Sequence, residues 1–355
     1  MQSRTSHATP MRTVLLGNSD LCVSSICLGT MTFGQQNSEA EAHAQLDLAQ
    51  ERGVNFIDTA EMYPVPARPE TTGLTERHVG TWLRRQDRSR IVVATKAAGP
   101  GRGLAWIREG RLDFTRDNLR QALEGSLQRL RTDYVDLYQL HWPDRNAAIF
   151  GRQRFQPEEE RASVPLQETL AALDSLIQAG KVRHWGLSNE TPWGVMSILR
   201  LADDMGIPRP VSVQNAYSLL NRTWENGLDE IGYREKVSLL AYSPLGFGLL
   251  SGKYLENPLA PGRVTLFQGF AARYGKPNTA RAVAAYADLA RRRGLTPTQL
   301  ALGFACGRWC VASTIIGATT LAQLQENLDA AQVPLSPEVL ADIECIHLKF
   351  PNPAP

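Results

Sequence analysis

The sequence predicts an α/β fold in which eight parallel strands close into a (β/α)8 TIM barrel. Short apolar runs rich in β-branched residues alternate with longer amphipathic segments almost from end to end, and eight such strand–helix units follow one another. Eight units in one chain favour a closed barrel over an open, doubly wound sheet. Because no linker divides the sequence, we expect residues 11–355 to form a single barrel domain, with residues 1–10 as a polar, disordered extension.

The domain opens with a predicted β-hairpin at residues 11–24, whose two halves meet at a polar turn at 17–20. The barrel strands are the short apolar runs that follow. We expect them at 26–30, 54–58, 91–95, 134–140, 182–187, 211–214, 237–241 and 312–316.

The helices between these strands have recognisable ends and apolar faces. Helix 38–53 has Ser38 as its N-cap and Gly53 as its terminator. Helix 115–131 is capped by Thr115 and repeats leucine at helical spacing. The other helices are expected at 73–85, 165–180, 192–205, 220–234, 278–293, 297–308, 320–330 and 337–347.

Three long segments, 97–114, 143–164 and 243–277, each follow the end of a strand. In a barrel, the segments that follow strands gather on the C-terminal face, and this face carries the active sites of barrel enzymes. We therefore expect an N-terminal hairpin at one end of the barrel and three long loops around a site at the other.

Composition argues against a nucleic-acid-binding, membrane-spanning or secreted protein. Lys and Arg number 38 and Asp and Glu 36, so the formal net charge is only +2, whereas nucleic-acid binders usually show a strong basic excess. No run of 18 apolar residues occurs, which argues against a membrane span. The first ten residues are polar and lack the apolar stretch of a signal peptide. We expect a cytoplasmic protein that binds neither nucleic acid nor membranes.

Cysteine and histidine give no sign of a disulfide framework or a metal site. The five cysteines are odd in number and form no C-x-x-C pair, which is typical of buried, reduced thiols in a cytosolic protein. The six histidines show no metal-ligand spacing, so we expect no metal.

Ionisable side chains follow three consecutive predicted strands. Asp58 and Tyr63 follow the second strand, Lys96 the third and His141 the fourth. Each alone has an ordinary explanation, because an Asp after a strand often caps a turn, a Lys is usually solvated, and a His beside Trp is often structural. Together, on adjacent strand ends of a barrel, they are much less expected by accident.

This set of residues suits the protonation of an oxygen that gains negative charge. A nearby ammonium such as Lys96 favours the phenolate of Tyr63 and lowers its pKa, while Asp58 would hold Lys96 charged. His141 could position a carbonyl oxygen by a hydrogen bond. No Ser–His or Cys–His pair suggests a nucleophile, and hydride would have to come from a cofactor.

A glycine-rich dinucleotide motif G-x-G-x-x-G is absent, but the last strand–helix unit offers another anion site. Gly317 and Thr319 lie where the strand opens into the N-terminus of a helix, which favours anions. Gln323, Glu326 and Asn327 follow on one helical face, which taken alone is an ordinary polar face.

Eight motifs occur in a specific order and spacing. They are LGTMTFG (28–34), DTAEMY (58–63), TK (95–96), LYQLHWP (137–143), GLSN (186–189), VQNAYSLLNR (213–222), AYSPLGFGLLSGKY (241–254) and IIGATTLAQLQENL (315–328). With them, the chain from about residue 11 onward resembles the NADPH-dependent aldo-keto reductases. The resemblance implies a barrel enzyme that reduces small-molecule aldehydes or ketones to alcohols. It also implies a catalytic tetrad of Tyr63 as general acid with Asp58, Lys96 and His141.

The resemblance further implies an NADP(H) site along the same face. The nicotinamide would meet Thr30, Met31, Ser188, Asn189 and Gln214, with Tyr242 stacked on its ring. The phosphates and adenosine would meet Ser243, Pro244, Leu245, Gly246, Lys253, Arg263, Gly317, Thr319, Gln323, Glu326 and Asn327. Many members of the family place a Lys or Arg just after the last strand to clamp the 2′-phosphate. Residues 319–327 contain none, so this chain departs from the family at this point and lacks that clamp on the 2′-phosphate.

Two other functions remain open at this point. The β subunits of voltage-gated potassium channels resemble this chain in fold, so it could be a cofactor-binding, redox-sensing partner protein. Those relatives resemble it less at His141, which favours an enzyme. A cofactor-free barrel lyase is a third possibility, but it would leave Gln323, Glu326 and Asn327 without a role.

Overall fold

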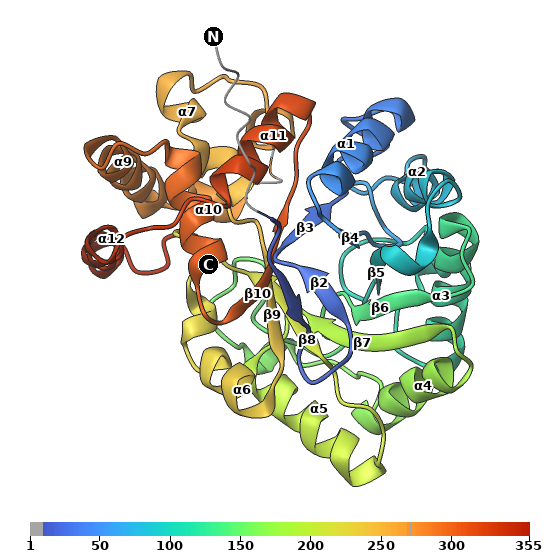
Figure 1. Cartoon of the computed structure of the whole chain (residues 1–355). Coiled ribbons are helices and arrows are strands. Elements are labelled where there is room, and N and C mark those ends of the chain that lie inside the picture. Colours follow the sequence, from blue (N-terminus) through green and yellow to red (C-terminus); the bar gives the residue numbers. More distant parts are fainter. Residues whose placement is uncertain (1–9, 268, 270–271) are drawn as a thin grey trace.

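The computed structural model describes residues 10–355 except 268, 270 and 271. The extension expected at residues 1–10 falls almost wholly outside the described residues. Eight parallel strands form a closed barrel in the order β10-β3-β4-β5-β6-β7-β8-β9, so the predicted (β/α)8 fold is confirmed (Figure 1). The strands are β3 (Ile26–Gly29), β4 (Phe56–Asp58), β5 (Val92–Ala97), β6 (Val135–Leu140), β7 (Val182–Ser188), β8 (Ser212–Ala216), β9 (Ser238–Tyr242) and β10 (Val311–Ile316).

Helices surround the barrel, as the alternating pattern predicts (Figure 1). They are α1 (Glu39–Glu51), α2 (Leu74–Leu83), α3 (Arg116–Leu130), α4 (Leu166–Gln178), α5 (Pro192–Met205), α6 (Leu228–Glu235), α9 (Pro277–Arg292), α10 (Pro297–Gly307), α11 (Leu321–Ala330) and α12 (Pro337–Lys349). Ser38 caps α1 in a capping box with Glu41, which satisfies backbone N–H groups that the first turn leaves free. Helix α10 packs against β10 and α11 in the ring, and α12 packs against α9. None of the helices in the described part of the chain is long and apolar enough to cross a membrane.

One predicted helix is shorter than expected. The segment 220–234 was expected to be mostly helical, but its α-helix begins only at Leu228. The side chain of Asn221 accepts hydrogen bonds from the backbone and hydroxyl of Thr223, which offers the backbone a turn in place of a helix. Gly227 then adopts a φ of 106°, a left-handed conformation that ends the turn before α6 starts.

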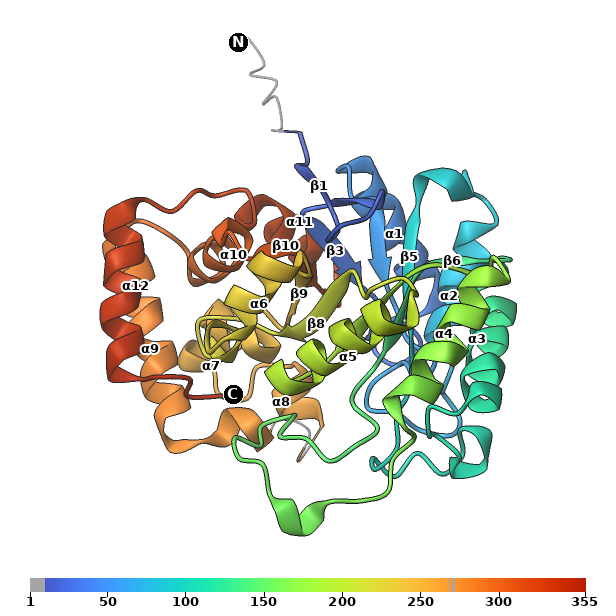
Figure 2. The same ribbon diagram turned by 90° about the horizontal axis from the view of Figure 1, so that it is seen from below.

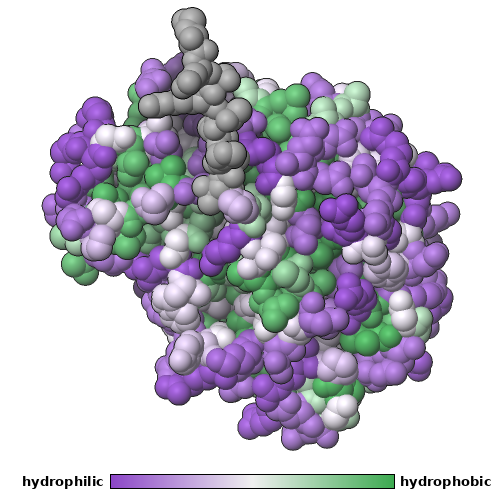
Figure 3. Space-filling view, viewed as in Figure 1, coloured by the Kyte–Doolittle hydropathy of each residue, from purple (hydrophilic) through white to green (hydrophobic). Residues whose placement is uncertain are grey.

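A β-hairpin closes one end of the barrel. Strands β1 (Thr13–Leu15) and β2 (Cys22–Ser24) pair antiparallel, and Leu16, Leu21 and Val23 pack among inward-facing residues of the barrel strands. Figure 2 shows the hairpin at one end of the barrel and the segment after β6 at the other. The face that carries the hairpin is mostly hydrophilic with scattered hydrophobic patches (Figure 3).

The long segments after strands carry only short helices. The segment 97–114 has a single 3-10 turn at Arg108–Gly110, and 143–164 has one at Pro157–Glu159. The segment 243–277 includes α7 (Lys253–Glu256) and α8 (Arg263–Leu266). All of these segments begin at carboxyl ends of barrel strands, so they surround the face opposite the hairpin.

Candidate active site

Inward-facing residues change from apolar to polar along the barrel strands. Near the hairpin, the inward residues are apolar and form one cluster that includes Cys27, Phe56, Ala94, Leu137 and Leu240. Because side chains alternate along a strand, the residue two positions further on also faces inward. Those residues are Gly29, Asp58, Lys96, Gln139 and Tyr242. The strand pattern therefore brings the polar residues together in one layer of the barrel interior, next to the apolar cluster.

Asp58, Lys96 and Tyr63 are in contact at this level. The Lys96 ammonium donates to Asp58 Oδ2 at 2.6 Å and to the carbonyl oxygen of Thr59 at 2.8 Å. Its third contact is the Tyr63 hydroxyl, 3.5 Å away. Lys96 is fully buried, so these partners stabilise its positive charge in place of water.

Burial and neighbouring charges raise the pKa values of both Tyr63 and Lys96. Burial raises the pKa of Tyr63 above its ordinary value of 10.0, and the positive charge of Lys96 only partly opposes this effect. The expectation that Lys96 lowers the pKa of Tyr63 is thus right for its own influence but wrong for the net shift. Burial alone would lower the pKa of Lys96, yet Asp58 and Tyr63 outweigh it, so the ammonium stays charged.

His141 lies beside Tyr63 and is neutral. The centroids of the two rings are 5.7 Å apart in an edge-to-face arrangement. Burial, followed by the positive charges of Lys96 and Arg102, lowers the pKa of His141 well below 6.5. Its Nδ1 atom has no hydrogen-bond partner among the described residues. A neutral imidazole in this position has one N–H to offer a carbonyl oxygen.

Two glutamines hold the second oxygen of Asp58. The side-chain amide of Gln214 donates to Asp58 Oδ1 at 2.8 Å, and that of Gln139 donates at 3.2 Å. Gln139 was not singled out from the sequence, although its inward position between Leu137 and His141 could have revealed it. Asp58 therefore has a fixed orientation toward Lys96.

Glu61 is a second residue that the sequence reasoning missed. Its carboxylate is buried, accepts the backbone N–H of Ala98 at 2.6 Å and pairs with Arg108. These contacts tie the segment that carries Tyr63 to the end of β5, two residues beyond Lys96. The signal in the sequence was an acidic residue in the middle of an otherwise buried DTAEMY segment.

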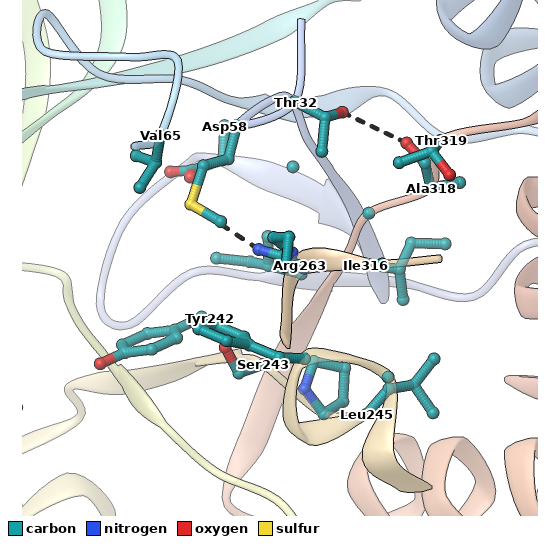
Figure 4. Close-up of a pocket in the computed structure, with 18 of the residues that line it drawn as sticks. Thr32, Asp58, Val65, Tyr242, Ser243, Leu245, Arg263, Ile316, Ala318 and Thr319 are labelled. Carbon is teal, nitrogen blue, oxygen red and sulfur yellow. Dashed lines mark hydrogen bonds between the residues drawn. The ribbon is translucent and has the colours of Figure 1, made fainter. Parts of the chain in front are cut away.

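The polar residues open into one cavity of about 680 Å³ on the C-terminal face. Figure 4 shows Asp58 and Val65 at one side of this cavity, Tyr242, Ser243 and Leu245 below them, and Thr319 at the far side. Among the predicted catalytic residues, Asp58, Tyr63 and His141 line it, and Lys96 lies behind them. The predicted cofactor residues that line it are Met31, Ser188, Asn189, Gln214, Tyr242, Ser243, Pro244, Leu245, Lys253, Arg263, Gly317, Thr319, Gln323, Glu326 and Asn327.

Two predicted cofactor residues do not line the cavity. Thr30 is fully buried, and its hydroxyl donates to the carbonyl oxygen of Asp58 at 2.8 Å. Gly246 has a φ of 54°, and a Cβ there would lie 3.1 Å from Leu220. Thr30 thus contacts the backbone of a cavity residue, Asp58, and Gly246 lies close to Leu220.

The side chains at the ends of β7 and β9 are joined by a hydrogen bond. Asn189 donates to the carbonyl oxygen of His141 at 2.8 Å and accepts the hydroxyl of Tyr242 at 2.7 Å. It has a φ of 54°, and Ser243 has a φ of 55°. Asn tolerates this left-handed region better than most residues do. These contacts fix the position of the Tyr242 ring at the cavity wall.

Two cations on the 243–277 segment face the cavity. Burial and then the positive charge of Arg263 lower the pKa of Lys253, so the two charges lie within reach of each other. The guanidinium of Arg263 lies 4.6 Å over the Phe247 ring. Its Nη1 atom lies 3.9 Å from Met31 Sδ, a contact that Figure 4 draws as a dashed line to Arg263. Neither cation pairs with a carboxylate in the parts of the chain that are described. The predicted contact of Arg263 with a 2′-phosphate stays a prediction.

At the far side of the cavity, the last strand–helix unit offers hydrogen-bonding groups without a cation. Gln323 Oε1 accepts the backbone N–H of Thr319 at 3.0 Å, and Asn327 donates to the carbonyl oxygen of Gly317 at 3.2 Å. The N-terminus of α11 begins beside them, capped by Thr320. The described residues hold no cluster of three or more metal-ligating side chains.

Comparisons with known proteins show which family this chain belongs to. Residues 25–347 match the model of the aldo/keto reductase family. The chain is 52% identical over 341 residues to Protein tas of Escherichia coli (strain K12), covering 95% of this chain and 98% of that protein. An aldo-keto reductase of Babesia bovis is 40% identical over 280 residues, 75% of this chain and 98% of that protein. A probable voltage-gated potassium channel subunit beta of Oryza sativa subsp. japonica is 32% identical over 340 residues, 93% of this chain and 95% of that protein. This chain, with its barrel and its polar cavity, therefore belongs to the aldo/keto reductase family of oxidoreductases.

Proposed function

We propose that this protein uses NADPH to reduce aldehydes or ketones to alcohols, with Tyr63 as the general acid. The observation that carries the proposal is the contact of Tyr63 with Lys96 and His141 at the base of a cavity of about 680 Å³. Cavities of this size bind small molecules and cofactors. The Lys253–Arg263 pair suits the phosphates of a dinucleotide, and the polar groups from Gly317 to Asn327 suit its adenosine.

In this mechanism, NADPH held along the cavity by residues such as Tyr242 and Lys253 would supply the hydride for the carbonyl carbon of the substrate. His141 donates a hydrogen bond that orients the carbonyl oxygen, and Tyr63 Oη transfers its proton to that oxygen as the C–H bond forms. The substrate thereby gains one hydride and one proton and becomes an alcohol. Lys96 stabilises the phenolate that Tyr63 leaves, and Asp58 keeps the ammonium of Lys96 in place.

The test measures the consumption of NADPH, through the fall in its absorbance, in the presence of a panel of aldehydes and ketones. Turnover of any member of the panel with formation of the alcohol supports an enzyme. The relative named as a channel β subunit suggests the second possibility, a redox-sensing partner protein. That protein would bind NADPH with a change in its fluorescence and consume none with any carbonyl compound.

The pKa shifts predict a flat pH profile for reduction. Burial and neighbouring cations lower the pKa of His141 well below 6.5, and burial raises that of Tyr63 above 10.0. His141 therefore stays neutral, and Tyr63 stays protonated, across the range of about pH 6–8 in which histidine usually titrates. We expect kcat/KM to be nearly constant over this range. An acid limb with a midpoint near the ordinary histidine pKa would show that His141 titrates in the free enzyme without the lowered pKa, and it would contradict this prediction.

Arg263 should provide most of the preference for NADPH over NADH. NADPH differs from NADH by one phosphate, residues 319–327 carry no cation, and Arg can form a two-pronged hydrogen bond to phosphate. A charge-assisted hydrogen bond contributes about 1.5–3 kcal/mol. Arg263→Ala should therefore weaken NADPH binding about tenfold or more and leave NADH binding nearly unchanged. Titration of both cofactors into wild type and variant measures this, and an equal loss for the two would show that Arg263 does not contact the 2′-phosphate.

A further inference from the structure

The substrate side of the cavity carries two arginines that the proposed catalytic and cofactor residues do not include. Arg102 comes from the 97–114 segment, Arg273 comes from the segment after β9, and both line the cavity. Their guanidinium carbons lie 4.2 Å and 6.0 Å from the centroid of the Phe150 ring, which belongs to the 143–164 segment. Segments that follow three different strands thus bring two positive charges to one aromatic ring.

An aromatic wall connects these arginines with the catalytic centre. The His141 ring is 4.8 Å from the Trp142 ring, and Trp142 is 5.9 Å from Phe150. The guanidinium carbon of Arg102 lies 5.8 Å from the centroid of Trp142. A single indole therefore separates Arg102 from the residue that would orient the carbonyl oxygen.

No carboxylate of the described chain pairs with either arginine. Arg102 is exposed and Arg273 is half-buried. Arg102 is partly desolvated by the surrounding cavity walls, and this desolvation, followed by the positive charge of Arg273, lowers its pKa. The charge of Arg102 in turn contributes to the lowered pKa of His141. The two charges are thus close to each other, and their field reaches the catalytic centre.

The cofactor does not account for these charges. The proposed function assigns its phosphates to a separate pair of cations, Lys253 and Arg263, whose positive charges lie close enough to repel each other. Of the described acidic residues that line the cavity, Asp58 is engaged by Lys96, and Glu326 belongs to the last strand–helix unit. The end of the cavity near Phe150 is therefore positive, and a ligand placed there gains from carrying negative charge.

We propose that Arg102 and Arg273 form an anion subsite, and that the natural substrate is an aldehyde or ketone with a carboxylate or phosphate group near its carbonyl. This inference rests on the proposed reductase function. The carbonyl would lie at Tyr63 and His141, and the anionic group would receive hydrogen bonds from the guanidinium groups past Trp142. The aromatic wall would cover the carbon skeleton between them.

The test compares 4-carboxybenzaldehyde with its uncharged methyl ester, methyl 4-formylbenzoate. The measured quantity is the ratio of kcat/KM for the acid to kcat/KM for the ester, so that general damage to the enzyme cancels. Arg102→Gln and Arg273→Gln should each lower this ratio about tenfold or more, because each removes a charge-assisted contact. Arg102→Lys keeps the charge and should retain part of the preference. Added salt should also reduce the wild-type ratio, because Arg102 is exposed.

Arg111→Gln is the matched control, because Arg111 lies on the same segment as Arg102 and its exposed side chain contacts only Glu109 among described acidic residues. It should leave the ratio unchanged. A ratio that stays at the wild-type value in both Arg102→Gln and Arg273→Gln overturns the subsite, even though the enzyme reduces both aldehydes.

A binding experiment separates failure of the subsite from failure of the reductase proposal. Benzoate and uncharged benzamide are titrated into the NADP⁺-loaded protein, and the fluorescence of the protein is followed. Tighter binding of benzoate that is lost in Arg102→Gln supports the subsite even if neither aldehyde is reduced. Equal binding of the two compounds, with no difference between wild type and Arg102→Gln, overturns it.

Discussion

Tyr63→Phe is expected to slow turnover by about 10²- to 10⁴-fold, the usual loss when a general acid is removed. The aromatic ring packs with Ala60 and Val65, and Phe keeps these contacts. Only the hydroxyl, 3.5 Å from the Lys96 ammonium, is lost. Steady-state measurement of kcat with NADPH and an aldehyde gives the effect, and a fluorescence titration should show that NADPH affinity hardly changes.

Tyr286→Phe provides the matched control for this change. Tyr286 is almost fully buried in α9, and its hydroxyl has no hydrogen-bond partner among described residues, so the same atom is removed away from the cavity. It should leave kcat close to the wild-type value. If Tyr63→Phe also turned over near the wild-type rate, the proton would have to come from another group, and the assignment of Tyr63 would be wrong.

Lys96→Met should abolish most activity while the fold survives. Met has a similar length and suits a fully buried position, but it removes the cation that stabilises the phenolate of Tyr63. Asp58 keeps the amides of Gln139 and Gln214 as donors to its other oxygen, so its carboxylate is not left without partners. Turnover is measured as for Tyr63→Phe, and urea unfolding reports the stability of the variant.

Asp58→Asn should reduce turnover less than Lys96→Met, because the ammonium remains but is held less firmly. Its effect on stability should be the larger of the two. Asn has one acceptor oxygen in place of two and no negative charge, so it cannot serve both the Lys96 ammonium and the amide donors of Gln139 and Gln214. The Lys96 charge would stay buried without its counter-ion, and breaking a buried ion pair in this way costs about 3–5 kcal/mol. If Asp58→Asn were the more damaging to turnover while Lys96→Met stayed active, the order of these roles would be reversed.

Most of the fold followed from local patterns in the sequence. The alternation of apolar runs with amphipathic helices predicted the closed barrel, and capping residues such as Ser38 marked helix ends that the structure confirms. The segment 220–234 was predicted less well, because the decisive features are the side-chain turn of Asn221 and the left-handed Gly227, which helical periodicity does not register. The sequence pattern also placed Asp58, Lys96 and His141 on neighbouring strand ends, where the structure brings them together.

The sequence by itself determined which strand residues meet, because alternation along eight parallel strands sends every second side chain into one barrel interior. This alternation places Asp58, Lys96 and Gln139 in one layer, next to the apolar layer of Phe56, Ala94 and Leu137. Only the tertiary structure decided how those residues are charged and what the loops add. The net rise in the pKa of Tyr63 and the fall in that of His141 depend on burial, which is a property of the closed barrel and its loops. Likewise, Arg102, Phe150 and Arg273 are far apart in the chain and show no periodic pattern, so only the packing of three loops could place them around one cavity.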